Sequence, residues 1–439
     1  MSLPKYHDLK VASAEWVGAI PVHWEETRLR FVAGISNSNV DKKEYEGQFP
    51  VRLCNYTDVY YNERITPDLD FMVATASKSE IQKFELKKGD VIITKDSEDP
   101  LDIGVPAIVE SDMPGVVCGY HLTVIRAGDP VTADFIRYSF MSDVNKARMY
   151  VRTPGITRFG LNQDTIKSTL ILLPPMEERI RIVEWLRTET AQIDGLIEKK
   201  GRFIELLKEK RAAVITHAVT KGIDADVPMK DSGQDWLGQI PRHWDVVPPT
   251  ALFTESKERA HEGDQMLSAT QKYGVIPLAD FEELEQRQVT MAVVNLDKRK
   301  HTEIGDFVIS MRSMDGGLER ARAVGSVRSS YSVLKCGPEV EGRFFGYLLK
   351  SSLYIQALRL TTSFIRDGQD MNFSHFRKVR LPRVPMDEQV RIADHIARET
   401  TLIDSLIEKT NRSIELLKEK RSALITAAVT GKIDVRKAA

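Results

Sequence analysis

The sequence predicts an α+β protein: two mixed α/β domains separated by two long helices that form an antiparallel coiled coil, with a pseudo-twofold internal repeat. The first observation is that RFIELLKEKRAAVITHAVTK at 202–221 returns as RSIELLKEKRSALITAAVTG at 412–431 in a chain of 439 residues. The second is that WVGAIPVHW at 16–24 returns as WLGQIPRHW at 236–244. The third is that the middles of the two halves share only isolated positions. One duplicated scaffold therefore carries two different inserts.

The repeated ends of the two halves carry the signals of long helices. Pro175 and Pro385 are each followed by acidic residues, as in a first helical turn, and Gly222 and Gly431 mark the stops. We therefore expect four parts. They are a first domain with an opening docking strip at 1–173, a long helix at 174–222, a second domain with its strip at 223–382, and a second long helix at 383–434.

A stripe with alternating 4,3 spacing runs along both helices, which is the pattern of a coiled-coil seam. Its members are Ile193, Ile197, Lys200, Ile204, Leu207, Arg211, Val214, Ala218 and Ile403, Ile407, Thr410, Ile414, Leu417, Arg421, Leu424, Ala428. Polar residues interrupt both copies at matching positions, Lys200/Thr410 and Arg211/Arg421. This match favours pairing of the two helices with each other. The alternative is that each helix packs on its own domain.

The two inserts have the pattern of mixed α/β domains. Short β-rich runs, such as 91–94, 122–126 and 307–310, are separated by loops rich in Gly, Asp and Ser. A helical stretch follows at 132–150 and at 341–359. The Trp and Pro residues of the repeated opening segment indicate an ordered strip that joins each insert to the scaffold.

Composition places the chain among globular proteins with sizeable cores, since 42 % of residues are apolar and 28 % are charged. The sequence has no signal peptide, no apolar run near 18 residues and no CxxC pair among its three cysteines, so we expect a reduced, cytoplasmic setting. The formal net charge of −1 argues mildly against nucleic-acid binding. A local basic excess at 196–212 is better read as a solvated helix face than as a DNA groove.

Motifs for catalysis are not found. The sequence lacks GxxxxGK[ST], a GxGxxG after a strand, and the Asn/Asp-Pro-Pro-Tyr/Phe pattern that resembles an adenine methyltransferase motif. No nuclease pattern is convincingly filled. None of the nine histidines falls in a metal-ligand spacing, so we expect no catalytic residue and no metal site.

Two pairs of loops are candidates for DNA contact. In the first, a Gly-Asp turn (Gly89-Asp90, Gly305-Asp306) leads into a strand that ends in a polar cluster, a rigid mount for reading base edges. In the second, loops rich in Gly, Thr and Asn with one Arg precede each long helix and suit approach to phosphates. The alternative is ordinary surface turns with solvated charges. The candidate DNA-binding residues are Lys95, Asp96, Ser97, Thr157, Arg158, Asn162, Lys272, Tyr273, Arg312, Ser313, Arg366 and Asn372.

Together these motifs resemble the specificity (S) subunit of a type I restriction-modification system. The resemblance rests on WxGxIPxHW before each insert, GD[VF][IV]I[ST] within it, and PPMEE/PMDEQ followed by ELLKEKR and AVT after it. It covers essentially the whole chain, twice. It implies two target recognition domains, each reading one half of an asymmetric bipartite DNA sequence, and helices that fix the spacer.

The same resemblance implies the partners. Two methyltransferase (M) subunits would dock on the repeated regions, motor-nuclease (R) subunits would join, and S-adenosylmethionine, ATP and Mg²⁺ would belong to these partners, leaving this chain without a cofactor. Half-sites about one helical turn apart, on the order of 34 Å, would face the same side of the duplex. The alternatives are the specificity subunit of a methylation-only complex, a self-contained DNA methyltransferase or nuclease, and a coiled-coil assembly protein.

Overall fold

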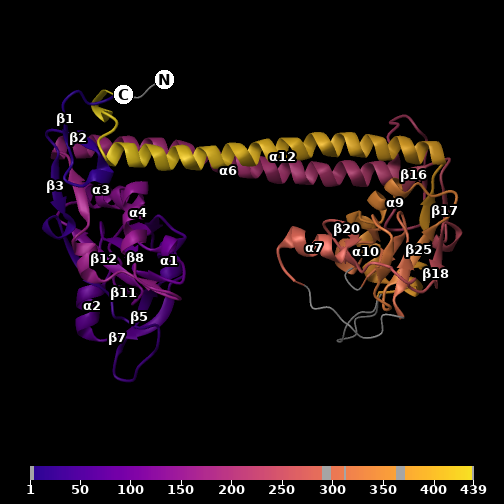
Figure 1. Cartoon of the computed structure of the whole chain (residues 1–439), viewed down its shortest axis with the longest axis horizontal. Helices are drawn as coiled ribbons and strands as arrows, with labels where there is room; N and C mark the ends of the chain where they lie inside the picture. Colours follow the sequence, from indigo (N-terminus) through magenta and orange to yellow (C-terminus); the bar gives the residue numbers. More distant parts are fainter. Residues whose placement is uncertain (1–3, 289–297, 311–312, 362–370, 438–439) are drawn as a thin grey trace. The chain divides into compact units, whose positions relative to one another are not determined.

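The computed structural model describes residues 4–288, 298–310, 313–361 and 371–437 (Figure 1). It has two compact units: Met1–Lys200 with Asn411–Ala439, and Gly201–Thr410. The long helices are α6 (Met176–Lys221) and α12 (Met386–Val429), so each unit holds one α/β domain and a part of both helices. In each unit α6 and α12 lie side by side and antiparallel (Figure 1). No helix within these described ranges is both long and apolar enough to cross a membrane.

The domain of unit 1 contains a five-stranded and a three-stranded sheet. The larger sheet has the order β4 (Ala33–Asn37), β12 (Leu122–Ala127), β8 (Val91–Thr94), β10 (Pro106–Val109), β6 (Arg64–Ile65). The smaller has the order β11 (Val116–Cys118), β5 (Phe49–Cys54), β7 (Met72–Ala76). The paired strands are β1 (Leu9–Val11) with β2 (Ala19–Pro21), β3 (Glu25–Arg28) with β14 (Leu170–Leu173), and β9 (Asp96–Ser97) with β13 (Phe159–Gly160). The helices are α1 (Tyr56–Tyr60), α2 (Lys78–Phe84), α3 (Pro130–Met141), α4 (Asp143–Arg152) and α5 (Gln163–Lys167).

Strand β8 shows why its sequence is apolar throughout. Successive side chains of a strand point to opposite faces of the sheet. Val91 and Ile93 pack in the core that contains α3 and the start of α6, whereas Ile92 packs in the core against the three-stranded sheet. Because both faces of β8 are covered, its pattern is a continuous apolar run and not an alternation.

The domain of unit 2 has a smaller central sheet in the described residues, ordered β18 (Phe253–Ser256), β25 (Ser332–Cys336), β22 (Phe307–Ile309), β23 (Glu319–Arg320). The paired strands are β15 (Met229–Asp231) with β16 (Gln239–Pro241), β17 (Asp245–Val247) with β26 (Leu381–Arg383), β19 (Leu267–Thr270) with β20 (Gly274–Pro277), and β21 (Lys300–Thr302) with β24 (Gly325–Val327). The helices are α7 (Leu278–Glu285), α8 (Ser313–Gly316), α9 (Gly342–Leu348), α10 (Ser352–Leu360) and α11 (Phe373–Phe376).

The two dissimilar inserts share a three-stranded core. Strands β4, β12 and β8 in unit 1 have the same order and antiparallel directions as β18, β25 and β22 in unit 2. The repeated Gly-Asp turn belongs to this core. Asp90 accepts hydrogen bonds from Arg126 Nε (2.8 Å) and Nη2 (2.9 Å), and Asp306 lies 3.1 Å from Lys335 Nζ. The cation comes in both units from the neighbouring strand, so the turn is a structural element of each domain.

Candidate nucleic-acid interface

The seam of the two long helices is the one that the 4,3 stripe predicts. Every residue of the stripe is buried or half-buried, with Ile193 and Ile403 among the most buried. Mutual pairing of α6 and α12 is thereby confirmed in each unit, in place of the alternative in which each helix packs only on its own domain. The helices therefore form the predicted antiparallel coiled coil.

Two equivalent arginine–aspartate pairs set the register of the helices. In unit 1, Arg421 Nε donates to Asp194 Oδ1 at 2.9 Å, and in unit 2, Arg211 Nε donates to Asp404 Oδ1 at 2.9 Å. The four residues are related by the 210-residue repeat offset. The second predicted polar position acts differently, because Thr410 donates its hydroxyl to Leu406 O of its own helix at 2.7 Å.

The repeated Trp-containing strip is fastened to the first turn of a long helix by a buried carboxylate. In unit 1, Glu178 accepts from Trp24 Nε1 at 3.0 Å and pairs with His23 Nε2 at 2.7 Å. In unit 2, Glu388 binds Trp244 Nε1 (3.0 Å) and His243 Nε2 (2.7 Å) in the same way. A buried indole N–H needs an acceptor, and a carboxylate is favoured at a helix N-terminus, so one acid serves both requirements.

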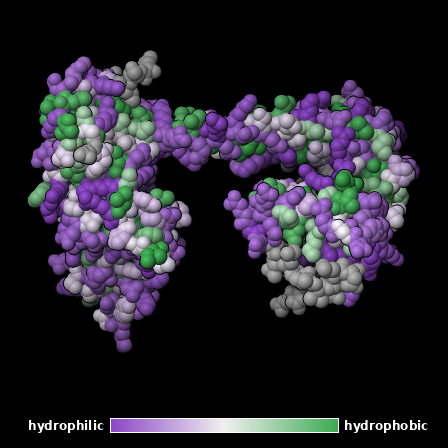
Figure 2. Space-filling view, viewed as in Figure 1, coloured by the Kyte–Doolittle hydropathy of each residue, from purple (hydrophilic) through white to green (hydrophobic). Residues whose placement is uncertain are grey.

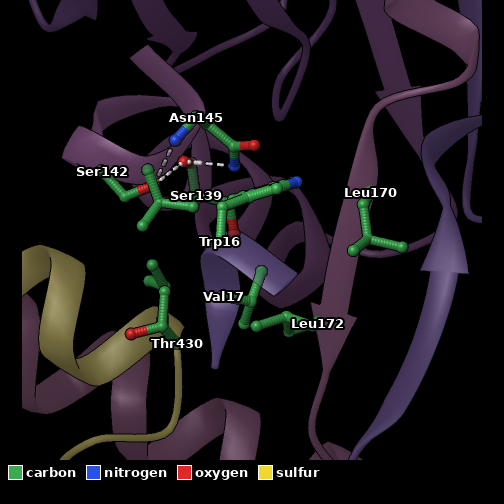
Figure 3. A pocket seen from close by; sticks show the side chains of 10 residues that line it. Trp16, Val17, Ser139, Ser142, Asn145, Leu170, Leu172 and Thr430 are labelled. Carbon is green, nitrogen blue, oxygen red and sulfur yellow. Dashed lines mark hydrogen bonds between the residues drawn. The ribbon is translucent and has the colours of Figure 1, made fainter. Parts of the chain in front are cut away.

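Each strip also meets the end of the other long helix. Gly431 follows α12 with φ +67°, and a Cβ there would lie 2.3 Å from Pro21 Cδ. In the second unit Gly222 follows α6 with φ +75°, and a Cβ would meet Trp244 at 3.6 Å. In Figure 3, Trp16, Val17 and Thr430 surround a cavity of about 10 Å³, which is too small for a ligand. This junction is therefore a packing contact between the strip and the helix end, and not a ligand site.

In unit 1 the structure brings the two predicted loops together. Strand β9, which contains Asp96 and Ser97, pairs antiparallel with β13, which directly follows Arg158. Arg158 Nη2 lies 3.3 Å from Asp96 Oδ1, and Asp96 also pairs with His121 Nδ1. Arg158 Nη2 lies 3.1 Å from His121 Nδ1. The result is an acid–histidine–arginine cluster at one edge of the sheet, which we call the Arg158 cluster.

The side chains of these loops differ in exposure and in the hydrogen bonds that they already make within the chain. Arg158 is the most available, with 62 % of its side chain exposed, and Thr157 is exposed beside it. Lys95 Nζ donates to Ser38 O at 3.3 Å, and Ser97 Oγ accepts from Asp99 N at 3.2 Å. Asn162 accepts from Thr165 N at 2.7 Å and caps α5. Arg158 is thus the donor best placed to bind a base edge or a phosphate.

His121 belongs to this cluster but is absent from the sequence-based candidates. Strands β8 and β12 are antiparallel, so the residue before β12 lies beside the residue after β8. The backbone shows this contact, because Lys95 N donates to His121 O at 3.0 Å. The sequence predicted both strands, but it did not show that they are neighbours in the sheet.

In unit 2 the corresponding loops lie partly outside the described residues. Arg312 and Arg366 are among the residues that are not described. Ser313 is buried, and its Oγ accepts from Ser310 N at 2.9 Å. Asn372 accepts from Ser374 N at 2.9 Å as the cap of α11, which is the same role that Asn162 has in unit 1. DNA contact by these residues stays a prediction.

The other two candidates lie at the turn of the β19–β20 hairpin. Lys272 Nζ is 4.7 Å from the ring centroid of Tyr273, whose hydroxyl donates to Glu285 Oε1 at 2.9 Å. The hydrogen bond from Tyr273 holds the pKa of Glu285 below its usual value. Lys272 keeps 72 % of its side chain exposed, so its ammonium group can still reach a phosphate.

Lys272 lines a groove of about 720 Å³ in unit 2 that contains six cationic side chains. These are Arg211, Lys272, Arg320, Arg322, Arg343 and Lys350. Lys350 pairs with Glu319 at 2.8 Å, and burial raises the pKa of that acid although Lys350 opposes the shift. Within the described part of the chain, no ion pair or hydrogen bond is made by the guanidinium groups of Arg320 and Arg322. Sequence reasoning did not find this groove, because its residues come from distant segments.

Comparisons with known proteins all find similarity to type I restriction specificity proteins. The family model of the type I restriction modification DNA specificity domain matches residues 21–205. The putative type I restriction enzyme MjaX specificity subunit of Methanocaldococcus jannaschii is 21% identical over 428 residues, covering 96% of this chain and 96% of that protein. The EcoBI specificity subunit of Escherichia coli is 21% identical over 293 residues, covering 64% of this chain and 62% of that protein.

Two solved structures are similar in fold. The HsdS subunit from Thermoanaerobacter tengcongensis has a TM-score of 0.54 at 17% identity, covering 94% of this chain and 98% of that one. A chain from a structural study of complex assembly and conformational transition of the type I R-M system has a TM-score of 0.64 at 17% identity, covering 94% and 99%.

Proposed function

We propose that this chain is the specificity subunit of a type I restriction-modification system and selects DNA in the following way. On this proposal the chain is not itself a catalyst. In our proposal each α/β domain is a target recognition domain that binds one half of an asymmetric bipartite sequence. The coiled coil sets the spacer and docks two methyltransferase subunits, and motor-nuclease subunits join them. S-adenosylmethionine, ATP and Mg²⁺ are bound by those partners.

The observation that carries this proposal is that the scaffold contacts are the same in both units, whereas the surfaces of the two inserts differ. The Arg–Asp pairs and the Glu–His–Trp contacts recur in both units with nearly the same distances. The Arg158 cluster of unit 1 and the basic groove of unit 2 are different in residues and in position on the domain. A nearly twofold scaffold with two unlike binding surfaces suits a target made of two unlike half-sites.

Docking of two copies of one partner is supported by apolar residues exposed beside the seam. Leu196 of α6 and Leu406 of α12 are related by the repeat and are 46% and 45% exposed. Leu206 and Leu416 form a second such pair. Figure 2 shows hydrophobic residues reaching the surface along the helices. Exposed leucines on a helix face mark an interaction surface, and equivalent patches in the two units fit two identical subunits.

The test of half-site reading is a substitution in one domain. Arg158→Ala, in a complex reconstituted with methyltransferase subunits, should relax one half-site and leave the other unchanged. A good bidentate contact to a base is worth about 1–3 kcal/mol, or about 5- to 150-fold in discrimination. Methylated positions in a random-sequence DNA library would be read by sequencing.

Arg30→Ala is the matched control, since Arg30 is exposed in the same domain and lies outside the Arg158 cluster. If Arg158→Ala weakened both half-sites equally, Arg158 would be a phosphate-binding or folding residue. Methyl transfer by the purified chain alone, with S-adenosylmethionine and unmethylated DNA, would instead favour a self-contained methyltransferase.

A further inference from the structure

Three potential metal ligands meet in the domain of unit 2. Glu258 and His261 lie in the segment after β18, and His301 lies in the middle of β21. One ligand atom from each of them lies within 4.8 Å of the other two. Glu258 and His261 are exposed and His301 is buried, so two of the three potential ligands are accessible to solvent.

The buried His301 has a carboxylate partner on one ring nitrogen, as metal-binding histidines usually have. His301 Nδ1 lies 2.9 Å from Asp264 Oδ2, and both side chains are more than nine-tenths buried. A carboxylate that accepts the Nδ1 proton leaves the lone pair on Nε2 and orients the ring, which is the usual outer-shell partner of a ligating histidine. Asp264 is itself fixed by the backbone N–H of His261, 2.9 Å from Oδ2.

The exposed members can complete the set. His261 Nε2 is 3.0 Å from Glu258 Oε1, and Lys335 Nζ approaches the other carboxylate oxygen at 3.9 Å. Lys335 lies closer to Asp306, at 3.1 Å, and it approaches Oε2 of Glu258, the oxygen that does not face His261. The rings of His261 and His301 are stacked with centroids 4.0 Å apart, which keeps the two imidazoles next to each other.

We propose that Glu258, His261 and His301 bind a divalent transition metal of the zinc class. Two imidazoles and one carboxylate supply three ligands, and water takes the fourth tetrahedral position. The ion would join the segment that follows β18 to β21, two parts of the domain 40 residues apart between His261 and His301. The site is independent of the proposed DNA reading.

The sequence predicted no metal site, because a separation of 40 residues is not a recognised ligand spacing. A surface ion pair between Glu258 and His261 would account for two of the residues. It would not account for a buried His301 whose Nδ1 is held by a buried aspartate and whose ring lies against His261. A metal site accounts for all four residues.

The experiment titrates Zn²⁺ into the full chain, purified without a histidine tag, by calorimetry, with bound metal counted by mass spectrometry after dialysis. One zinc per chain is expected. His261→Ala removes an exposed ligand without disturbing the core and should weaken binding at least tenfold. Asp264→Asn should weaken it about 10- to 100-fold. His217→Ala, on the exposed face of α6, should leave binding unchanged.

A second readout does not depend on affinity. Cobalt bound in place of zinc should give the strong visible absorption of a tetrahedral site in the parent chain, and Glu258→Gln should weaken or shift that absorption. Zinc should also raise the melting temperature of the parent chain but not of His261→Ala. Equal zinc binding by the parent chain and by His261→Ala, or no bound zinc in the parent chain, would overturn the proposal.

Discussion

Replacing Glu388 by alanine should separate the repeated strip of unit 2 from its long helix. Glu388 is 5% exposed and accepts from Trp244 Nε1, which belongs to a fully buried indole. Alanine leaves that N–H without an acceptor, at a cost of about 1–3 kcal/mol. The contact with His243 adds little, because 45% of the histidine side chain is exposed. A loss of about 2 kcal/mol would lower the melting temperature of a unit of this size by about 4–8 °C.

The neighbouring Asp387 provides the control. Asp387→Ala removes the same charge from the same helical turn, but Asp387 is exposed, so only the interaction with the helix terminus is lost, about 0.3–1 kcal/mol. Thermal and urea unfolding of the purified chain would compare the two variants. Adding Trp244→Phe to each completes a double-mutant cycle. The reasoning is refuted if both variants lose the same stability, or if Trp244 and Glu388 show no coupling.

Three further predictions concern the seam, acid stability and salt. Arg211→Asp or Asp404→Arg alone should cost about 0.2–1 kcal/mol in urea unfolding, and the double exchange should restore most of it. Burial acts to raise the pKa of Asp134. Arg137 and Arg187 outweigh this effect and hold the pKa of Asp134 below its usual value. Stability from this acid is therefore present above pH ~3.9 and lost as the pH falls through the lower folded value, so Asp134→Asn should flatten the acid limb of a pH–stability curve. Arg322→Ala should reduce the slope of log affinity against log salt by about 0.9 if it neutralises one phosphate, whereas an unchanged slope would remove it from the interface.

The scaffold could be predicted because its signals are local or repeated. The 4,3 stripe identifies the seam from one helix alone, and the second copy identifies the partner. The aspartates that bind Arg211 and Arg421 could not be predicted, since Asp194 and Asp404 are exposed acids like many others on a solvated helix. Choosing between them requires the register of the two helices, which only the packed structure supplies.

The candidate binding surfaces were less predictable because they depend on which strands are neighbours. The sequence indicated the loops around Asp96 and Arg158 but not the contact between them, nor the place of His121 beside both. It also gave Asn162 as a DNA-binding candidate, and the structure adds that this side chain caps a helix. An asparagine before a short helix has the same composition signal as one in a phosphate-binding loop. DNA contact by Asn162 stays a prediction.

The strands that open and close each insert bring its two ends side by side. Glu25 to Arg28 pair with Leu173 to Leu170, and Asp245 to Val247 pair with Arg383 to Leu381, so each insert leaves and re-enters the scaffold through adjacent antiparallel strands. A foreign domain whose two ends meet at the spacing of one strand pair could be grafted there without lengthening any connection. In the proposed function, such an exchange at two fixed junctions would replace the half-site that is read, while the helices and the strips retain their sequence.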